Sequence, residues 1–457
     1  MERIYYAESD QGTVRLAIKD DFHEFDNIYT VVVGKNGVGK SRLLSRIAKE
    51  RIRYYPFDPD YQHYRDIENL PKVIAVSTSP FDKFPSNRRS VRSLDVDSNY
   101  RYVGIRGEGP FGASSAVSLL SSAAKGWLEK IARFDNTANL IAVFKSLDFE
   151  PYAEFVFKPG YIGTPKSKDF SEDLLGDVFY QEIERLRVRH GVSLDERYLA
   201  QLADCSPEQR RDIYDAMGEI SHFESQRKVV TLEVDFTTGE FHTGAHHSSR
   251  ALPKAILTLL SAGLMRLMDI RLVKKNYGMM SLKRASSGEQ CLLVMMLGIA
   301  GHITNNSLIL IDEPEISLHP KWQEEFILML TRIFMSYSGC QFIIATHSPQ
   351  IISRLPISGC YVASLSDNSI RRSEEFSKRS ADYQLAELFD APGVMNEYIA
   401  RLAFNLLSRV KAAKRVSKEN WRELEQLKNL SFNVERTDPI KDLVASVVEV
   451  CEIYANN

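Results

Sequence analysis

The residues with the clearest chemical meaning lie in one run near the start of the chain. The run consists of Gly34, Lys35, Asn36, Gly37, Val38, Gly39, Lys40, Ser41 and Arg42. Its first part matches G-x-x-x-x-G-K-[ST], in which glycines let backbone N–H groups wrap around a polyphosphate. In this pattern Lys40 neutralises the β- and γ-phosphates, and the Ser41 hydroxyl ligates Mg²⁺. The run therefore predicts a site for ATP and Mg²⁺, with a glycine-rich turn as the alternative.

A pair of acidic residues, Asp312 and Glu313, follows an apolar stretch at 308–311. Carboxylates at the carboxyl end of a buried strand lie where open α/β sheets bind ligands. Asp312 suits Mg²⁺ held through its water shell, and Glu313 suits a general base that polarises an attacking water. A solvated turn is the alternative, which the presence of the phosphate-binding run disfavours.

A histidine, His347, follows a third apolar stretch at 341–345. A histidine at the end of a strand can contact the γ-phosphate or orient the attacking water, although a lone histidine is more often structural. Its position after a strand, like that of the acids, favours the functional interpretation.

Three buried parallel strands must position these side chains. The β-branched stretch 30–33 precedes the phosphate-binding run, and a helix is expected from Ser41 onward. Continuous apolar runs of this length are typical of parallel strands covered on both faces. The expected fold class is therefore α/β.

A fourth motif, Ser287-Gly288-Glu289, opens a long apolar helix. A helix N-terminus with a hydroxyl and a glycine is suited to binding an anion. Together the four motifs resemble the ABC-type ATPases. In that comparison Ser287, Gly288 and Glu289 are the signature motif, and 317–320 is the D-loop.

The resemblance implies an ABC-type P-loop ATPase head, with a mixed sheet flanked by helices. It also implies a head-to-tail homodimer or higher homo-oligomer, in which Ser287 and Gly288 of one copy close over the γ-phosphate held by Lys40 of the other. Glu289 replaces the second glycine of the transporter consensus, and the D-loop reads SLHP. Both departures are similar to the soluble SMC/RecF/OLD-like branch.

A finer resemblance, to the PtuA family of Septu-type anti-phage defence ATPases, rests on two segments. These are VIAVSTSPFDKFP and YRYVGIRGEG, and a short helical tail accompanies them. This resemblance implies an ATPase subunit that controls an HNH-type nuclease partner in bacterial defence.

The motifs divide the chain into four expected regions. Residues 1–160 form the N-terminal half of the head with the P-loop, and 161–230 form a helical insertion. Residues 231–370 form the C-terminal half with the signature, the acids and the histidine. Residues 371–457 form a helical C-terminal region, preceded by a hairpin near 361–371.

Composition narrows the class without identifying the chemistry. The chain has 457 residues, a formal net charge of −2 and a hydrophobic share of 44%. These values are typical of a soluble globular protein and give no sign of a dedicated nucleic-acid or membrane binder. No signal peptide or membrane-spanning run is visible, and the cysteines are widely scattered. The expected location is the cytoplasm.

Two other functions remain open from the sequence. A RecF- or SMC-like DNA-repair or DNA-clamping ATPase would use duplex DNA as its partner, although direct contact with nucleic acid is not the leading expectation. Basic clusters that could serve it are Arg88, Arg89 and Arg92; Lys274, Lys275 and Lys283; and Lys411, Lys414 and Arg415. An autonomous nuclease would need metal-binding acids that the sequence does not reveal.

Overall fold

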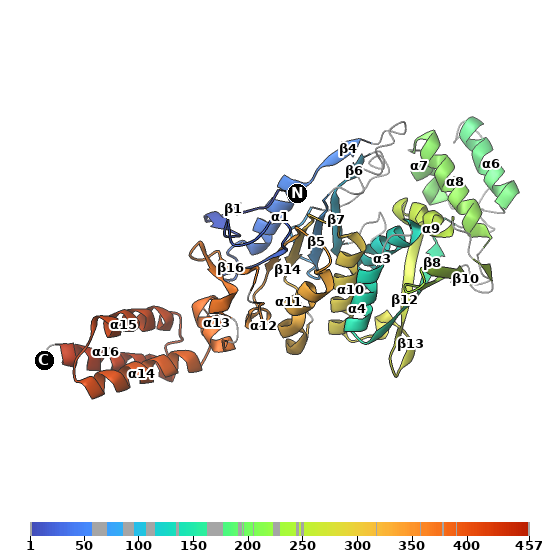
Figure 1. The fold of residues 1–457 in the computed structure, drawn as a ribbon. Coiled ribbons are helices and arrows are strands. Elements are labelled where there is room, and N and C mark those ends of the chain that lie inside the picture. The colour runs from blue at the N-terminus through green and yellow to red at the C-terminus, as the bar shows by residue number, and fades with distance from the viewer. Residues whose placement is uncertain are drawn as a thin grey trace.

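The structure is a computed structural model of the whole chain (Figure 1). The residues it describes are 2–56, 71–85, 96–106, 115–133, 137–161, 177–190, 194, 196–203, 205–222, 229–243, 246–247, 251–316, 318–356, 358–376, 379–389 and 391–455. Arg88, Arg89, Arg92 and Ser317 therefore lie outside the described residues.

A seven-stranded sheet lies at the centre of the fold, in the order β17-β16-β3-β15-β14-β5-β7. Neighbouring strands are parallel, except that β16 and β17 form the antiparallel hairpin expected near 361–371. The strands are β3 (Ile28–Val33), β5 (Val73–Ser77), β7 (Tyr100–Gly104), β14 (Leu308–Asp312), β15 (Gln341–Ala345), β16 (Cys360–Ser364) and β17 (Ser369–Arg372).

The central strands are buried on both faces, which explains their continuous apolar sequences. In β14, Ile309 and Ile311 enter one hydrophobic core, and Leu308 and Leu310 enter the other. Successive side chains of a strand point to opposite faces, so a sheet covered on both sides needs apolar residues at every position. The parallel strands and mixed sheet confirm the expected α/β class.

Helices cover both faces of this sheet. One face packs against α1 (Lys40–Arg51), and the opposite face packs against α3 (Ser115–Arg133), α10 (Ser287–His302) and α11 (Pro320–Phe334). The short helix α12 (Pro349–Ser353) follows β15. Thus α1 and α10 lie on opposite sides of the central sheet.

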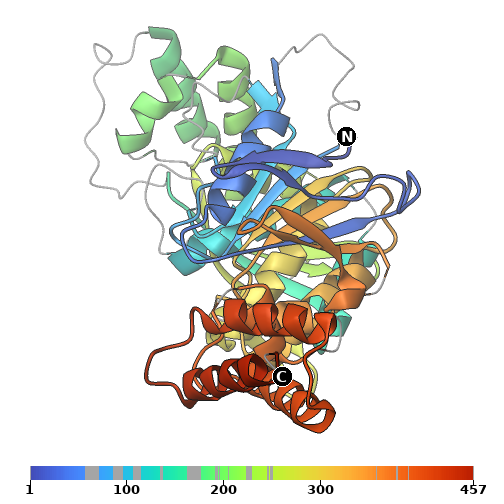
Figure 2. The same cartoon turned by 90° about the vertical axis from the view of Figure 1, so that its left-hand side faces the viewer.

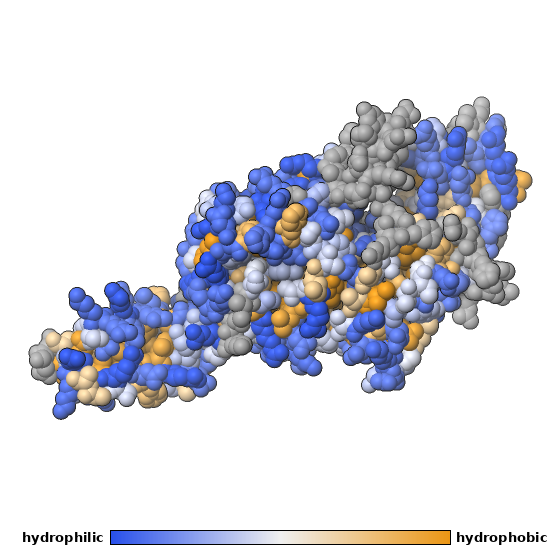
Figure 3. All heavy atoms as spheres, viewed as in Figure 1, coloured by the Kyte–Doolittle hydropathy of each residue, from blue (hydrophilic) through white to orange (hydrophobic). Residues whose placement is uncertain are grey.

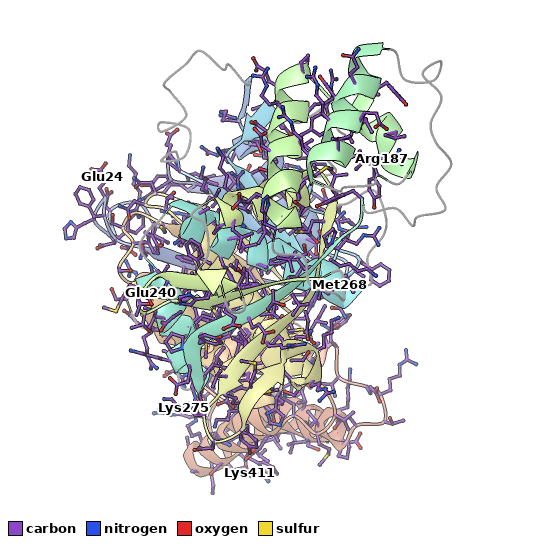
Figure 4. All side chains as sticks on the ribbon, turned by 90° about the vertical axis from the view of Figure 1, so that its right-hand side faces the viewer. Glu24, Arg187, Glu240, Met268, Lys275 and Lys411 are labelled. Carbon is purple, nitrogen blue, oxygen red and sulfur yellow. The ribbon has the colours of Figure 1, made fainter. Side chains whose placement is uncertain are left out.

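A second sheet has six antiparallel strands in the order β11-β10-β9-β8-β12-β13. One face packs on α3 and its neighbours, and Figure 4 looks onto the other face, where Met268 of β12 is labelled and is exposed. Burial along β12 alternates in its first half, as expected for a half-buried strand. The elements are α4 (Ala138–Ser146), β8 (Phe149–Pro159), β9 (Val230–Asp235), β10 (Glu240–Thr243), β11 (His246–His247), α9 (Leu252–Ser261), β12 (Met265–Lys274) and β13 (Gly278–Ser281).

The described residues between β8 and β9 contain three helices, which lie at the end of the molecule farthest from the C-terminus (Figure 1). They are α6 (Asp177–His190), α7 (Glu196–Ala203) and α8 (Pro207–Ser221). Ser206 and Gln209 form a reciprocal capping box that starts α8. The insertion therefore interrupts the antiparallel sheet.

The C-terminal helices form a bundle with its own hydrophobic core, which projects from the head (Figures 1 and 2). Helix α13 connects it to the head by packing against both α12 and α14. Apolar side chains are visible among polar ones on the bundle surface (Figure 3). The helices are α13 (Ala381–Glu387), α14 (Glu397–Ala413), α15 (Lys418–Ser431) and α16 (Pro439–Ala455).

In the described part of the chain, the remaining elements are two small sheets and two short 3₁₀ helices. They are β1 (Tyr6–Ser9) with β2 (Gly12–Arg15), β4 (Tyr54–Pro56) with β6 (Val96–Ser98), η2 (Leu282–Arg284) and η3 (Ser373–Glu375). Among the described residues, no helix is both long and apolar enough to span a membrane.

Candidate nucleotide-binding site

The phosphate-binding run forms the loop between β3 and α1. Gly34, Gly37 and Gly39 all have positive φ values, of 146°, 79° and 105°. At Gly39 a side chain would also meet the Asp10 carboxylate, because an added Cβ would lie 3.0 Å from its Oδ2. The glycines in the pattern are therefore required by the backbone path itself.

The N-terminus of α1 is open to an anion. Gly39 is its N-cap residue, no side chain caps the helix, and no acidic residue lies in the first turn. The N–H groups of a first turn lack intrahelical partners and carry the positive end of the helix dipole. Arg42 lies on this turn and pairs with Asp10 at the tip of the β1–β2 hairpin.

Lys40 is held in the loop by three polar contacts. Its Nζ donates to the carbonyl oxygens of Gly34, at 2.8 Å, and Lys35, at 3.3 Å, and lies 3.1 Å from Nδ1 of His347. Only 4% of the residue is exposed. Burial lowers the pKa of Lys40 to about 8, although Glu313, Glu315 and Asp312 oppose the shift. The ammonium group is thus desolvated in advance beside the phosphate loop.

The structure places Ser41 next to Asp312, the two residues that the sequence predicts to hold Mg²⁺. The Ser41 hydroxyl donates to Oδ1 of Asp312 at 3.0 Å. Burial raises the pKa of Asp312 to about 7, the Ser41 hydrogen bond lowers it, and the nearby acids Glu313, Asp82 and Glu315 raise it. A divalent cation between these oxygens would relieve that repulsion, since Mg²⁺ prefers oxygen ligands and commonly takes few from the protein.

Glu313 lies just past the end of β14 in a left-handed backbone conformation, with φ of 48°. Its N–H donates to the carbonyl of Ala345 at 2.9 Å. Its side chain is 28% exposed, so water can reach it. This backbone conformation costs free energy in a non-glycine residue, and such residues are typically found where the direction of the side chain serves a function. Here it directs the carboxylate toward His347, 3.5 Å from Nε2.

His347 lies between Lys40 and Glu313. Burial lowers its pKa to about 4, with the Lys40 charge contributing, so the ring is neutral at pH 7. Because an ammonium group can only donate, Nδ1 accepts from Lys40 and the ring proton is assigned to Nε2. The Nε2–H group of the His347 ring therefore faces Glu313 and the space where an attacking water would be activated.

Glu315 belongs to the same site, although no local sequence pattern distinguishes it from a solvated acid. Its Oε1 accepts the backbone N–H of His347 at 2.5 Å, and its buried Oε2 has no hydrogen-bond partner. Burial raises the pKa of Glu315. Asp312, Glu313 and Glu315 place three carboxyl groups beside the single positive charge of Lys40. This excess of acid favours a further cation, although the described residues contain no group of three or more side chains placed to hold a metal ion by themselves.

A second missed group fixes the segment after β5. Asp82 is fully buried and accepts the Tyr102 hydroxyl at 2.7 Å and the Arg106 Nε–H at 3.0 Å. These residues join VIAVSTSPFDKFP to YRYVGIRGEG, the two segments that the sequence singled out. Strand β5 neighbours β14, and its last residue, Ser77, pairs with Asp312.

The signature residues lie at the N-terminus of α10, across the sheet from α1. Ser287 is exposed and Gly288 is buried. Glu289 accepts from Lys274 at 2.5 Å and from the Ser286 hydroxyl at 3.0 Å. One chain therefore brings together the P-loop, both acids and the histidine, and leaves the signature residues on another surface.

The predicted basic clusters differ in their surroundings. Lys274 is engaged by Glu289, and Lys275 and Lys283 are exposed near the β12–β13 hairpin and η2. The exposed residues Lys411, Lys414 and Arg415 lie at the end of α14 and just beyond it. Arg88, Arg89 and Arg92 lie outside the part of the chain that the structure describes.

The fold and the site define a P-loop nucleotide-binding domain of mixed α/β architecture. A family model described as "AAA domain, putative AbiEii toxin, Type IV TA system" matches residues 206–353. The match includes the signature helix, both acids and His347, but not the phosphate-binding loop.

Three curated relatives match parts of the chain. Retron Ec83 probable ATPase of Escherichia coli is 34% identical over 91 residues, 18% of this chain and 16% of that protein. Retron Vc95 probable ATPase of Vibrio cholerae serotype O1 biovar El Tor is 29% identical over 172 residues, 34% of this chain and 32% of that protein. Protein ea59 of Escherichia phage lambda is 36% identical over 75 residues, 16% of this chain and 14% of that protein. The chain thus spans at most about a third of the length of these relatives.

Proposed function

We propose that this chain binds ATP with Mg²⁺ and hydrolyses it to ADP and phosphate. The observation that carries this proposal is the convergence of Lys40, Asp312, Glu313 and His347 at the ends of three adjacent strands, β3, β15 and β14. The family match and the names of the two retron relatives support it.

Each side chain has a distinct task in this reaction. The P-loop N–H groups and Lys40 would hold the phosphates, and Ser41 and Asp312 would hold Mg²⁺, which would neutralise charge on the phosphate oxygens. Glu313 accepts a proton from the attacking water. The neutral His347 donates from Nε2, which orients that water or the γ-phosphate.

Replacing Glu313 by glutamine tests the proposal. Glu313→Gln keeps the side-chain shape but removes the base, so hydrolysis falls by about 10²–10³-fold. Nucleotide affinity stays within about threefold of wild type, since the P-loop is intact. Phosphate release and equilibrium binding measure the two quantities, with Glu50→Gln on the exposed side of α1 as the control. Wild-type turnover in Glu313→Gln would contradict the assignment of the base.

We further propose that two copies associate around ATP. On this proposal the α10 N-terminus of one copy, with Ser287 and Gly288, closes over the γ-phosphate bound by the other. The placement of α1 and α10 on opposite faces supports it, because the signature residues then need a second chain to meet a phosphate.

The role that we propose for this switch is control of an HNH-type nuclease partner in anti-phage defence in the cytoplasm. The Septu-type resemblance and the two retron relatives support this role. We also propose that 1–160 and 231–370 act as the two halves of the head, with 161–230 as an insertion and 371–457 as a peripheral helical region. Co-purification with a nuclease encoded by an adjacent gene would test the partner.

A further inference from the structure

Glu315 is a half-buried acid beside the site, and one of its two carboxylate oxygens, Oε2, is buried without a hydrogen-bond donor. Burial raises the pKa of this carboxyl group, although the side chain of Thr346 lies close enough to oppose that rise. Leaving a buried acceptor unused costs free energy, and a neutral side chain would avoid that cost. The oxygen that is used, Oε1, accepts the backbone N–H of His347 at 2.5 Å.

The Glu315–His347 hydrogen bond joins the loop after β14 to the segment after β15, and Gln323 of α11 joins these two segments a second time. Its amide nitrogen donates to the carbonyl of Leu318 at 2.9 Å, and its amide oxygen accepts the Ser348 hydroxyl at 2.6 Å. The loop after β14 and the segment after β15 are therefore joined at His347 and again at the next residue, Ser348. The ring of His347 can occupy its place only while its main chain is held there.

The position of the His347 ring is restricted, because the ring contacts two other functional groups. Its Nδ1 lies 3.1 Å from Nζ of Lys40, and its Nε2 lies 3.5 Å from Oε1 of Glu313. A displacement of about 1 Å at such a position can reduce turnover by roughly 100-fold. A hydrogen bond to a charged acceptor is suited to preventing that displacement.

We propose that Glu315 is a positioning residue, which holds the main chain of His347 so that the ring stays between Lys40 and Glu313. This inference rests on the proposed ATP hydrolysis. Glu315 does not touch the reacting atoms; its effect on turnover passes through His347.

A double-mutant cycle between Glu315 and His347 tests this dependence. Glu315→Ala lowers kcat by about 10- to 100-fold, whereas the dissociation constant for a non-hydrolysable ATP analogue changes less than about threefold. In the His347→Ala background, adding Glu315→Ala produces no further loss. Losses that multiply in the double variant would overturn the proposal, and so would wild-type kcat in Glu315→Ala.

Two further variants separate positioning from charge and from folding. Glu315→Gln keeps an acceptor oxygen and is expected to retain at least about a third of wild-type kcat, since the hydrogen bond survives. Gln323→Leu removes the second tie, including the 3.4 Å hydrogen bond from Gln323 Nε2 to the main-chain carbonyl of Glu315, but leaves the Glu315 side chain in place, and it is expected to lower kcat by a smaller factor. Glu325→Ala on the same helix, α11, is the control and keeps wild-type turnover. A Glu315→Gln variant as impaired as Glu315→Ala would contradict a positioning role.

Hydrogen exchange of the peptide that contains residues 346–348 gives a readout that does not depend on hydrolysis. Glu315→Ala accelerates exchange at the His347 amide, and Glu315→Gln leaves it protected. If wild type binds ATP without hydrolysing it, the proposed function fails, and this exchange measurement still decides whether Glu315 holds the segment. Unchanged exchange in Glu315→Ala would refute that.

Discussion

The N-termini of α1 and α10 are both candidate phosphate sites, and their side chains differ in kind. Helix α1 begins at Gly39 without a side-chain cap and without an acid in its first turn. Helix α10 is capped by Ser286, whose oxygen accepts the N–H of Glu289 at 3.3 Å, and carries the Glu289 carboxylate in its first turn. The first is open to an anion; the second already holds one.

The charge of Glu289 is compensated by Lys274 from the end of β12, 2.5 Å away. The Lys274 contact and the Ser286 hydrogen bonds lower the pKa of Glu289 despite its burial, so the carboxylate is ionised at neutral pH. The difference supports the proposal that α1 would bind nucleotide within one chain. The end of α10 would contribute only when a second copy brings a phosphate to it.

The largest expected effect is the loss of nucleotide binding in Lys40→Ala. Removing a buried ammonium group that serves the phosphate loop should weaken ATP binding by on the order of 100-fold. Isothermal titration calorimetry measures the affinity, and Lys49→Ala on the exposed part of α1 is the matched control. If Lys40→Ala binds ATP within about threefold of wild type, α1 is not the primary site.

Mixing two inactive variants tests whether the two helix ends meet across copies. Lys40→Ala and Ser287→Arg should each lack turnover, while an equal mixture regains about a quarter of wild-type turnover, because half of the dimers hold one intact composite site of two. Replacing Ser287→Arg in the mixture by the Lys40→Ala/Ser287→Arg double variant should restore nothing. A mixture that stays inactive would argue against the head-to-tail arrangement.

A smaller effect is expected from the charge balance at α10. Lys274→Ala leaves the Glu289 carboxylate uncompensated, so ATP-dependent self-association weakens by about five- to tenfold. The Lys274→Ala/Glu289→Gln double variant should recover to within about threefold. Sedimentation in the Glu313→Gln background measures the association, and Lys275→Ala is the control. Equal association in all variants would remove α10 from the interface.

The smallest effect concerns the cap itself. Ser286→Ala removes the side-chain acceptor at the start of α10 and should lower the free energy of unfolding by about 1 kcal/mol. Urea denaturation measures the change in the free energy of unfolding, and the affinity for ATP should stay unchanged. A reduced ATP affinity in this variant would blur the distinction between the two helix ends.

Much of the site was predictable because its signals are local. The glycine positions in the P-loop are set by positive φ values, which few other residues adopt. Asp312 and His347 each follow a continuous apolar strand, and parallel strands deliver their carboxyl ends to one edge of the sheet. Such features depend on neighbouring residues and can be seen in a single sequence.

Glu315 and the Asp82–Arg106 pair could not be found in that way. Glu315 contacts the main chain of a residue 32 positions away, and Asp82 contacts one 24 positions away. Nothing in the local pattern distinguishes these charged residues from solvated ones. The only available hint was that acidic residues continue past Glu313.

The arrangement of β8, β9 and β12 into one antiparallel sheet was also beyond the sequence pattern. These strands pair across the insertion that contains α6, α7 and α8, and half-buried strands accept many partners. Their pairing depends on the apolar surface of α3 and α9 that the strands cover in the folded protein.

The amino-acid sequence by itself determined the α/β class, the P-loop, and the acids and histidine at the strand ends. The reason is that backbone conformation and strand burial depend on the types of adjacent residues. Only the tertiary structure decided that Glu315 supports His347 and that Lys274 offsets Glu289. It also decided that α1 and α10 lie on opposite faces of the sheet. These relations join residues from separate elements, and they exist only once the hydrophobic cores have set those elements in place.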